Sequence, residues 1–184
     1  AADPERVVIV DEAYVDFGGE SALPLLDRYD NLLVVMTFSK SRALAGARLG
    51  FAMGSRALIE GLERVRDAFN SYPVDRVAEA VGIAAVRDGA WFEANRARIM
   101  ATREKTAARL AALGFSIVPS SANFLFAGRP GIPAKRIYSA LREQGILVRY
   151  FDKPRIDGYL RITIGTPEDM DALCAALSKM NMEE

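Results

Sequence analysis

The sequence predicts an α/β fold, and two observations support this prediction. Short runs of β-branched and aliphatic residues recur along the chain, which is typical of buried strands. Between them lie longer segments whose apolar residues recur with the helical period. Strands that alternate with helices indicate a sheet covered by helices. A long helical segment beginning at residue 91 divides the chain into two expected parts, residues 1–90 and residues 91–184.

The first part is expected to hold three strands. Its elements are, in order, a strand at 7–10, a turn at 17–20, a short helix at 23–28, strands at 32–36 and 49–53, and helices at 56–69 and 74–86. Ser55 is a favourable N-cap for the helix at 56–69, on which Leu58, Leu62 and Val65 share one face. A loop interrupts the helical pattern around Tyr72, which we expect to be a packed aromatic.

The second part is expected to be a small α+β domain. Residues 91–113 form one long helix closed by Gly114, because glycine readily takes the left-handed conformation at a helix C-terminus. The elements that follow are strands at 116–118 and 123–127, a helix at 133–144, strands at 147–150 and 159–164, and a helix at 167–180. Cys174 lies on the apolar face of that last helix, and we expect it to be a buried, small hydrophobic side chain.

Composition and charge exclude several classes of function. The 184 residues carry 24 basic and 24 acidic side chains, so the chain lacks the basic footprint of a nucleic-acid binder. Neither a membrane-spanning apolar run nor a signal peptide is evident. The chain has no histidine, which excludes Ser-His-Asp and Cys-His catalysis, and with a single cysteine we expect no metal site. These features predict a cytoplasmic enzyme whose acid–base chemistry uses lysine, carboxylates or tyrosine.

Lys40 is the first candidate for catalysis. Thr37 and Ser39 precede it after the apolar run 32–36, and Arg48 follows eight residues later. A lysine amine is mostly protonated at neutral pH because its free pKa is about 10.4, and Schiff-base chemistry avoids this by holding the nitrogen in an imine. Two hydroxyls and a forked guanidinium are groups that bind phosphate. Together they predict an aldehyde cofactor with a phosphate group, which is pyridoxal 5'-phosphate.

Asp11 ends the β-branched run at 7–10, and it is the second candidate. Ligands of α/β proteins bind at the carboxyl ends of parallel strands, so we expect Asp11 at that edge of the sheet. An ionised carboxylate there can keep a pyridine nitrogen protonated, which makes the ring an electron sink. Tyr14, three residues further on, could donate to the phenolic oxygen of the same ring.

Each candidate also has an ordinary structural interpretation. Considered alone, Lys40 would be a solvated surface residue, Asp11 a turn or helix cap, and Tyr14 a half-buried core residue. Arg161 is different, because it interrupts an apolar strand pattern and a buried arginine needs an anionic partner. Arg149 also lies in a strand-like segment, where alternation could simply place it in water.

Four blocks of the sequence carry a family resemblance. They are Asp11–Phe17, Thr37–Gly50, Ser121–Leu125 and Tyr159–Gly165. In order and spacing they resemble the fold-type-I aminotransferases, which depend on pyridoxal phosphate, and most closely the histidinol-phosphate aminotransferases. The resemblance runs from about Val7 to the last residue and matches the C-terminal half of that family. It implies that residues 1–90 are the remainder of the cofactor-binding large domain and residues 91–184 a linking helix with a small C-terminal α+β domain.

The resemblance implies a role for each matching position. Lys40 is the expected catalytic residue, which would form the Schiff base and then serve as general acid and base. The expected cofactor-binding residues are Asp11, Tyr14, Thr37, Ser39, Lys40 and Arg48. The expected substrate-binding residues are Arg161, which would bind an α-carboxylate, Asn123, which would support that contact, and Arg149, which would face a substrate phosphate.

The resemblance also implies a reaction and a partner. The family moves an amino group from histidinol phosphate to 2-oxoglutarate in histidine biosynthesis, and it forms homodimers. Two alternatives stay open: a related enzyme of the same fold, such as a threonine-phosphate decarboxylase or an aromatic aminotransferase, and a catalytically silent fragment. The second is considered because the chain lacks an initiating methionine and any candidate for the family's phosphate-cradling loop, which lies in the N-terminal half.

Overall fold

The computed structural model describes residue 3 and residues 5–180. The chain divides into two compact units, Ala1–Asn95 and Arg96–Glu184, and each is described by itself. The boundary lies inside one continuous helix, α3 (Gly89–Ala112), which is the long helix expected at 91–113. The expected division into domains at residue 90 stays a prediction.

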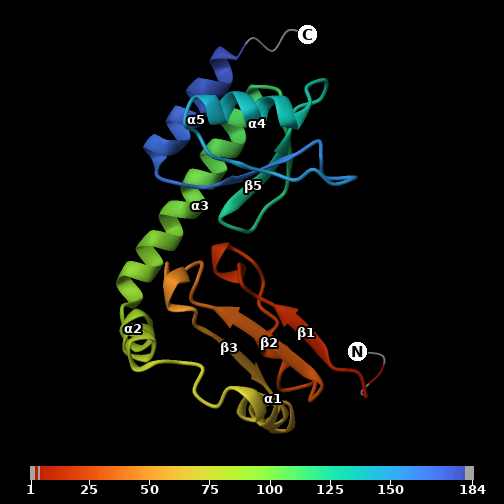
Figure 1. The fold of residues 1–184 in the computed structure, drawn as a ribbon, viewed down its shortest axis with the longest axis vertical. Coiled ribbons are helices and arrows are strands. Elements are labelled where there is room, and N and C mark those ends of the chain that lie inside the picture. The colour runs from red at the N-terminus through yellow and green to blue at the C-terminus, as the bar shows by residue number, and fades with distance from the viewer. Residues whose placement is uncertain (1–2, 4, 181–184) are drawn as a thin grey trace. The chain divides into compact units, whose positions relative to one another are not determined.

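The first unit is built on a three-stranded sheet with the order β1–β2–β3 (Figure 1). β1 (Val8–Asp11) pairs parallel with β2 (Leu32–Thr37), and β3 (Gly50–Gly54) pairs antiparallel with β2 on its other side. β2 is the central strand, and its first three residues are buried. The three strands expected from the sequence are confirmed, each within one residue at either end.

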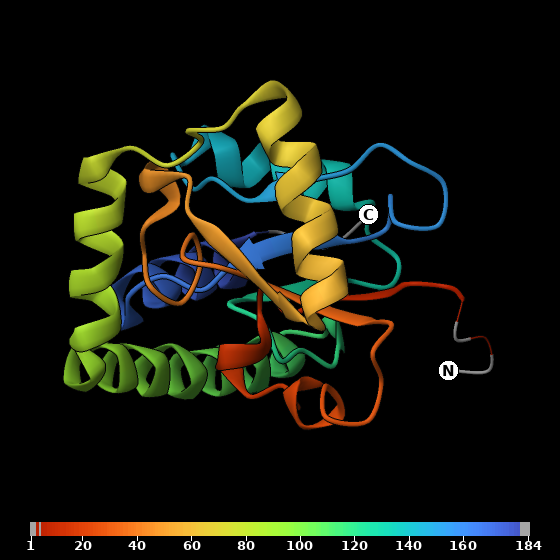
Figure 2. The same cartoon turned by 90° about the horizontal axis from the view of Figure 1, so that it is seen from below.

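Two helices follow the sheet in this unit. α1 (Arg56–Phe69) matches the expected helix, and Ser55 Oγ accepts a hydrogen bond from the amide of Leu58 as its N-cap. α2 (Arg76–Arg87) begins two residues later than expected because the Asp75 carboxylate caps it, accepting from two amides of its first turn. α2 and the start of α3 meet at a sharp corner (Figure 2).

The predicted helix at 23–28 was wrong. The segment forms only a single 3-10 turn, η2 (Leu23–Leu25), which has no side-chain cap. One turn of helix fixes several dihedral angles for a single hydrogen bond, so it does not propagate without support from packing. Two more 3-10 turns, η1 (Val15–Phe17) and η3 (Ala45–Ala47), belong to the blocks that carry the candidate residues.

Much of the apolar surface of the first unit is exposed. The face expected on α1 does not form a core within this unit, since Leu62 and Val65 are 46% and 62% exposed. Phe69, at the end of the same helix, is 80% exposed. Tyr72 is 92% exposed, so the expectation that it packs in its loop was wrong. Several exposed apolar side chains on one unit are typical of a surface that another polypeptide covers.

The second unit is built on a four-stranded antiparallel sheet with the order β4–β5–β7–β6. Its strands are β4 (Ser116–Val118), β5 (Phe124–Gly128), β6 (Arg149–Tyr150) and β7 (Leu160–Thr163), and its helices besides α3 are α4 (Ala134–Glu143) and α5 (Pro167–Lys179). The strand expected at 147–150 is shortened to two residues. Gly145, with φ of +76°, and the hydrogen bond from the Ile146 amide to the Leu141 carbonyl close α4 first, so the next residues lie outside the ladder.

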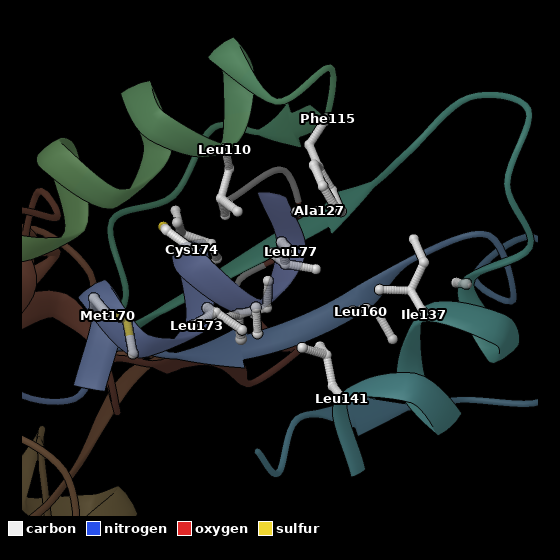
Figure 3. Packing of buried hydrophobic residues seen from close by; sticks show 14 of the residues in the cluster. Leu110, Phe115, Ala127, Ile137, Leu141, Leu160, Met170, Leu173, Cys174 and Leu177 are labelled. Carbon is white, nitrogen blue, oxygen red and sulfur yellow. The ribbon is translucent and has the colours of Figure 1, made fainter. Parts of the chain in front are cut away.

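One face of this second sheet carries a continuous hydrophobic core. Leucine and methionine side chains of α5 meet Leu110 of α3, Ile137 and Leu141 of α4, and Leu160 of β7 (Figure 3). Cys174 lies in the same cluster at 4% exposure, as expected from the sequence, and burial raises the pKa of its thiol. Among the described residues, no helix has both the length and the apolar character needed to cross a membrane.

Replacement of a core leucine should weaken the second unit. Leu173 is 1% exposed, so Leu173→Ala removes buried methyl groups and leaves a cavity, which should lower the free energy of unfolding by about 3 kcal/mol. Leu147→Ala, at 81% exposure, should change it by less than about 0.5 kcal/mol. Urea denaturation followed by circular dichroism measures both. Equal losses for the two variants would contradict the assignment of this core.

A second prediction concerns the start of α5. Asp169 accepts a hydrogen bond from the Thr166 amide, and the Thr166 hydroxyl accepts one from the Asp169 amide. The backbone hydrogen bond and then the side-chain hydrogen bond to Thr166 lower the pKa of the Asp169 carboxyl. A carboxyl whose pKa is lower in the folded state stabilises the fold above its unfolded pKa, near 3.8, and loses this contribution as pH falls through the folded value.

Asp169→Asn should therefore lower the thermal unfolding midpoint at pH 7 and have a smaller effect near the lowest pH at which the protein stays folded. Asp30→Asn, at an exposed position, is the matched control and should change the midpoint at neither pH. A midpoint difference between Asp169→Asn and the wild-type chain that stays the same at every pH would show that the carboxylate charge is not involved.

Candidate active site

The carboxyl ends of β1 and β2 lie at one edge of the first sheet because the two strands are parallel. Asp11 is the register partner of Val35, and β2 ends two residues later at Thr37. Asp11 is exposed, and its Oδ1 accepts a hydrogen bond of 3.0 Å from the amide of Ala13. This tight turn leads the chain from β1 into η1, and Tyr14 lies at the start of η1.

The two blocks predicted to bind one cofactor meet at this edge. The ammonium group of Lys40 lies over the ring of Tyr14, with Nζ 5.6 Å from the ring centroid. Both side chains are half-buried. A cation over an aromatic face is attracted to the π electrons of the ring. The contact therefore places the amine next to the segment that carries Asp11.

Hydrogen bonds shape the turn that carries Lys40. The Thr37 hydroxyl donates to the Leu49 carbonyl at 3.4 Å and accepts from the Ser39 amide at 3.1 Å. The Ala43 amide donates to the Lys40 carbonyl at 3.1 Å, and Ala43 takes a φ of +56°. That conformation costs a residue with a side chain about 1 kcal/mol, so the surrounding contacts must hold it.

Arg48 is exposed at the end of η3. It also has a positive φ, of +52°, and its Nη1 donates to the Ala45 carbonyl at 2.9 Å. Within the described residues it makes no hydrogen bond or ion pair with Lys40 or Asp11. Because a guanidinium carries five N–H donors, most of the donors of Arg48 are left for a ligand.

A cavity of about 350 Å³ lies in the same unit. Its lining is apolar except for Glu79 and Arg87, and it includes Phe38, Leu49 and residues of α2. Gly82 of α2 allows a close approach there, since a Cβ at this position would lie 2.4 Å from Cδ2 of Leu49. A hollow of this kind offers few partners for a phosphate, so the candidate site is the polar strand edge and not this cavity.

Sequence reasoning missed two buried polar residues that lie beside the predicted site residues, and one of them joins the two blocks. Ser41 is 2% exposed, and its hydroxyl donates to Asp16 Oδ2 at 2.5 Å. Glu12 is 5% exposed and accepts hydrogen bonds from the Ser21 hydroxyl and the Ala22 amide. Each is a polar residue next to a predicted site residue, which is the only signal in the sequence. The sequence alone gives no reason to pair Asp16 with a serine 25 positions away.

The second unit brings two of the predicted substrate residues together. Arg149 of β6 and Arg161 of β7 are register partners and so lie side by side on one face of the sheet. The Phe151 ring is near both guanidiniums, at 5.3 Å and 5.9 Å from the two Cζ atoms. Arg161 Nε is buried and has no hydrogen-bond partner among the described residues. Two like charges directly opposite each other repel unless an anion binds between them.

Asn123 lies close to this pair in the fold but is not joined to it. It is half-buried immediately before β5, and its carbonyl accepts the Ile164 amide at 2.9 Å. Within the described residues its side chain makes no hydrogen bond to either arginine. The predicted cofactor residues thus belong to the first unit, and the predicted substrate residues to the second.

The chain belongs to the aminotransferase class I and II family, whose sequence model matches residues 2–177. It is 59% identical over 179 residues to histidinol-phosphate aminotransferase 1 of Bordetella parapertussis, covering 97% of this chain and 50% of the relative. It is 60% identical over 173 residues to histidinol-phosphate aminotransferase of Chromohalobacter salexigens, covering 94% and 49%. The chain therefore spans about half the length of these relatives.

A solved structure shares the fold. Histidinol-phosphate aminotransferase from Sinorhizobium meliloti, in complex with pyridoxal-5'-phosphate, superposes with a TM-score of 0.84 at 27% identity, over 95% of this chain and 48% of that chain. The α/β fold expected from the sequence and the resemblance to this family are confirmed.

The repulsion between Arg149 and Arg161 gives a measurable consequence. At low ionic strength Arg149→Gln should raise the thermal unfolding midpoint, because it removes a like-charge pair that costs up to about 1 kcal/mol. Inorganic phosphate should raise the wild-type midpoint and have little effect on the midpoint of Arg149→Gln. Arg136→Gln, on the exposed surface of α4, serves as control and should respond to phosphate as the wild type does. An equal response of all three proteins would rule out anion binding by this pair.

Proposed function

We propose that this chain is the lysine-bearing part of a pyridoxal-phosphate-dependent aminotransferase that transfers the amino group of histidinol phosphate to 2-oxoglutarate. The observation that carries the proposal is the meeting of Lys40 Nζ with the Tyr14 ring, 5.6 Å away, at the strand edge that ends in Asp11. The choice of reaction is supported by the identity of 59% and 60% to two histidinol-phosphate aminotransferases.

The residues at this edge fit the cofactor. A planar pyridine with an aldehyde, a phenolic oxygen and a phosphate needs an amine, a phenol, a carboxylate and phosphate donors. Lys40, Tyr14 and Asp11 supply the first three of these groups. The Ser39 hydroxyl, the free donors of Arg48 and the hydroxyl of Thr37, once turned from the Leu49 carbonyl, supply the phosphate donors. When bound, pyridoxal phosphate provides an aldehyde that captures an amine and a ring that accepts electrons.

The role of each side chain follows from its chemistry. Asp11, which is exposed at the end of β1, would hold a proton on the pyridine nitrogen. Tyr14 donates to the ring oxygen. Lys40 would hold the cofactor through Nζ and would move a proton at the substrate α-carbon, first as general base and then as general acid.

We propose that Arg161 and Arg149 take the anionic group of each substrate in turn. Glutamate and 2-oxoglutarate present a carboxylate, which suits a bidentate contact with Arg161 supported by Asn123. Histidinol phosphate lacks that carboxylate, and its phosphate fits between two opposed guanidiniums. The buried Nε of Arg161 without a partner supports this use.

We further propose that the protein acts in the cytoplasm as a homodimer, with residues 1–90 in the cofactor-binding domain and residues 91–184 in the smaller one. A related enzyme of the same fold, a threonine-phosphate decarboxylase or an aromatic aminotransferase, would use the same cofactor residues. A catalytically silent fragment is the second candidate.

The test is the colour of the bound cofactor. Mixing the chain with pyridoxal phosphate should give an absorption band at about 420 nm, which is characteristic of the imine. Lys40→Ala should abolish the band because, among the described residues, it removes the amine that lies at the strand edge beside Tyr14. Lys105→Ala, on an exposed turn of α3, is the control and should keep it.

The response of the band to added substrates then distinguishes the candidate enzymes. Histidinol phosphate, O-phosphothreonine and an aromatic amino acid are added in turn, and the one that bleaches the band fastest identifies the amino donor. A wild-type chain that stays colourless would identify the silent fragment and end the proposal of activity for these 184 residues.

A further inference from the structure

The residues that follow Lys40 make contacts that have no role in the proposed reaction. The residue directly after it, Ser41, is 2% exposed, although serine is usually found at the surface. Its hydroxyl donates to Asp16 Oδ2 at 2.5 Å, within the range expected for a hydroxyl bound to a carboxylate. A buried hydroxyl bound to a carboxylate is among the stronger hydrogen bonds of a protein.

Asp16 belongs to the other block of the site. It lies in η1, two residues after Tyr14, while Ser41 lies one residue after Lys40. The hydrogen bond therefore joins the segment carrying the phenol to the segment carrying the amine, 25 positions apart in the chain. The contact between Lys40 Nζ and the Tyr14 ring joins the same two segments.

The other side of the turn is held by Arg42. Its Nη1 donates to the carbonyl of Ala85 in α2 at 2.7 Å, and its guanidinium stacks 3.7 Å above the ring of Phe92. These contacts hold the backbone on the far side of Ser41. Ala43, next in the chain, takes its positive φ, a strained conformation that persists only where such contacts hold it.

We propose that Asp16 and Ser41 are positioning residues, whose hydrogen bond sets the direction of the Lys40 amine toward the Tyr14 side of the strand edge. They do not touch the cofactor or the reacting atoms in this assignment, and they act through the backbone of the Lys40 turn. The inference rests on the proposed function of Lys40. It goes beyond that function because it names the neighbours that make Lys40 more reactive than the other lysines of the chain.

The experiment compares all five lysines within one sample, at positions 40, 105, 135, 153 and 179. The chain is mixed with a limiting amount of pyridoxal phosphate, whose aldehyde condenses with an amine and releases water. Borohydride then reduces the C=N bond to a stable secondary amine, and peptide mass mapping gives the labelling rate at each lysine. The ratio of the rate at Lys40 to the mean rate at the other four is the readout.

Ser41→Ala should lower this ratio by about threefold to tenfold, which is the effect expected from losing one hydrogen bond. Asp16→Asn should lower it in the same direction. Ser41→Thr keeps the hydroxyl and should keep the ratio. Asp27→Asn, an exposed aspartate of the same unit, is the control and should leave it unchanged. Each variant is labelled well below its own thermal unfolding midpoint, so that a folded chain is compared with a folded chain.

The outcomes separate the two proposals. A wild-type chain that labels its five lysines equally overturns both, because no amine is then singled out. A wild-type chain selective for Lys40, with Ser41→Ala equally selective, leaves the proposed function intact and overturns the positioning role. Equal loss in Ser41→Ala and Ser41→Thr also overturns it, since the hydroxyl would then not be the group that matters. Loss in Ser41→Ala and Asp16→Asn with retention in Ser41→Thr supports it.

Discussion

The parallel pairing of β1 with β2 is the constraint on which the candidate site depends. Parallel strands end at the same edge of a sheet, so the residues that follow them are neighbours whatever their distance in the chain. Asp11 pairs with Val35 in this register, and the chain emerging beyond each strand carries Tyr14 on one side and Lys40 on the other. A shift of one strand by one residue would turn that strand's side chains to the opposite face and separate the pair.

The second sheet uses register for a different purpose. Antiparallel pairing of β6 with β7 sets Arg149 opposite Arg161, while Leu160 and Ile162 on alternate positions of β7 enter the core. Alternation thus places one strand's apolar residues and its cation on opposite faces. The arrangement puts two positive charges where an anion could lie, and hydrophobic packing behind the strand holds them there. β7 therefore contributes Leu160 and Ile162 to the core of this unit, while Arg161 between them faces Arg149 on the other side of the sheet.

Periodicity and capping signals predicted the three strands of the first unit within one residue, and Ser55 was identified correctly as a cap. The short helix at 23–28 and the strand at 147–150 could not be predicted well, because a turn such as that at Gly145 depends on how the preceding helix closes. The packing of Tyr72 was predicted wrongly for another reason, since exposure depends on which polypeptide covers a loop. Motif spacing selected Lys40 and Asp11, yet it gave no reason to join Asp16 to Ser41.

The single thiol of the chain has a useful consequence. Cys174 is enclosed by the core of the second unit, and burial raises its pKa, so a maleimide or disulfide reagent can reach the sulfur only when that core transiently opens. The sequence contains no other cysteine, so any modification reports on this one place. The rate of alkylation therefore measures how often the core around α5 opens, and no engineered probe is needed.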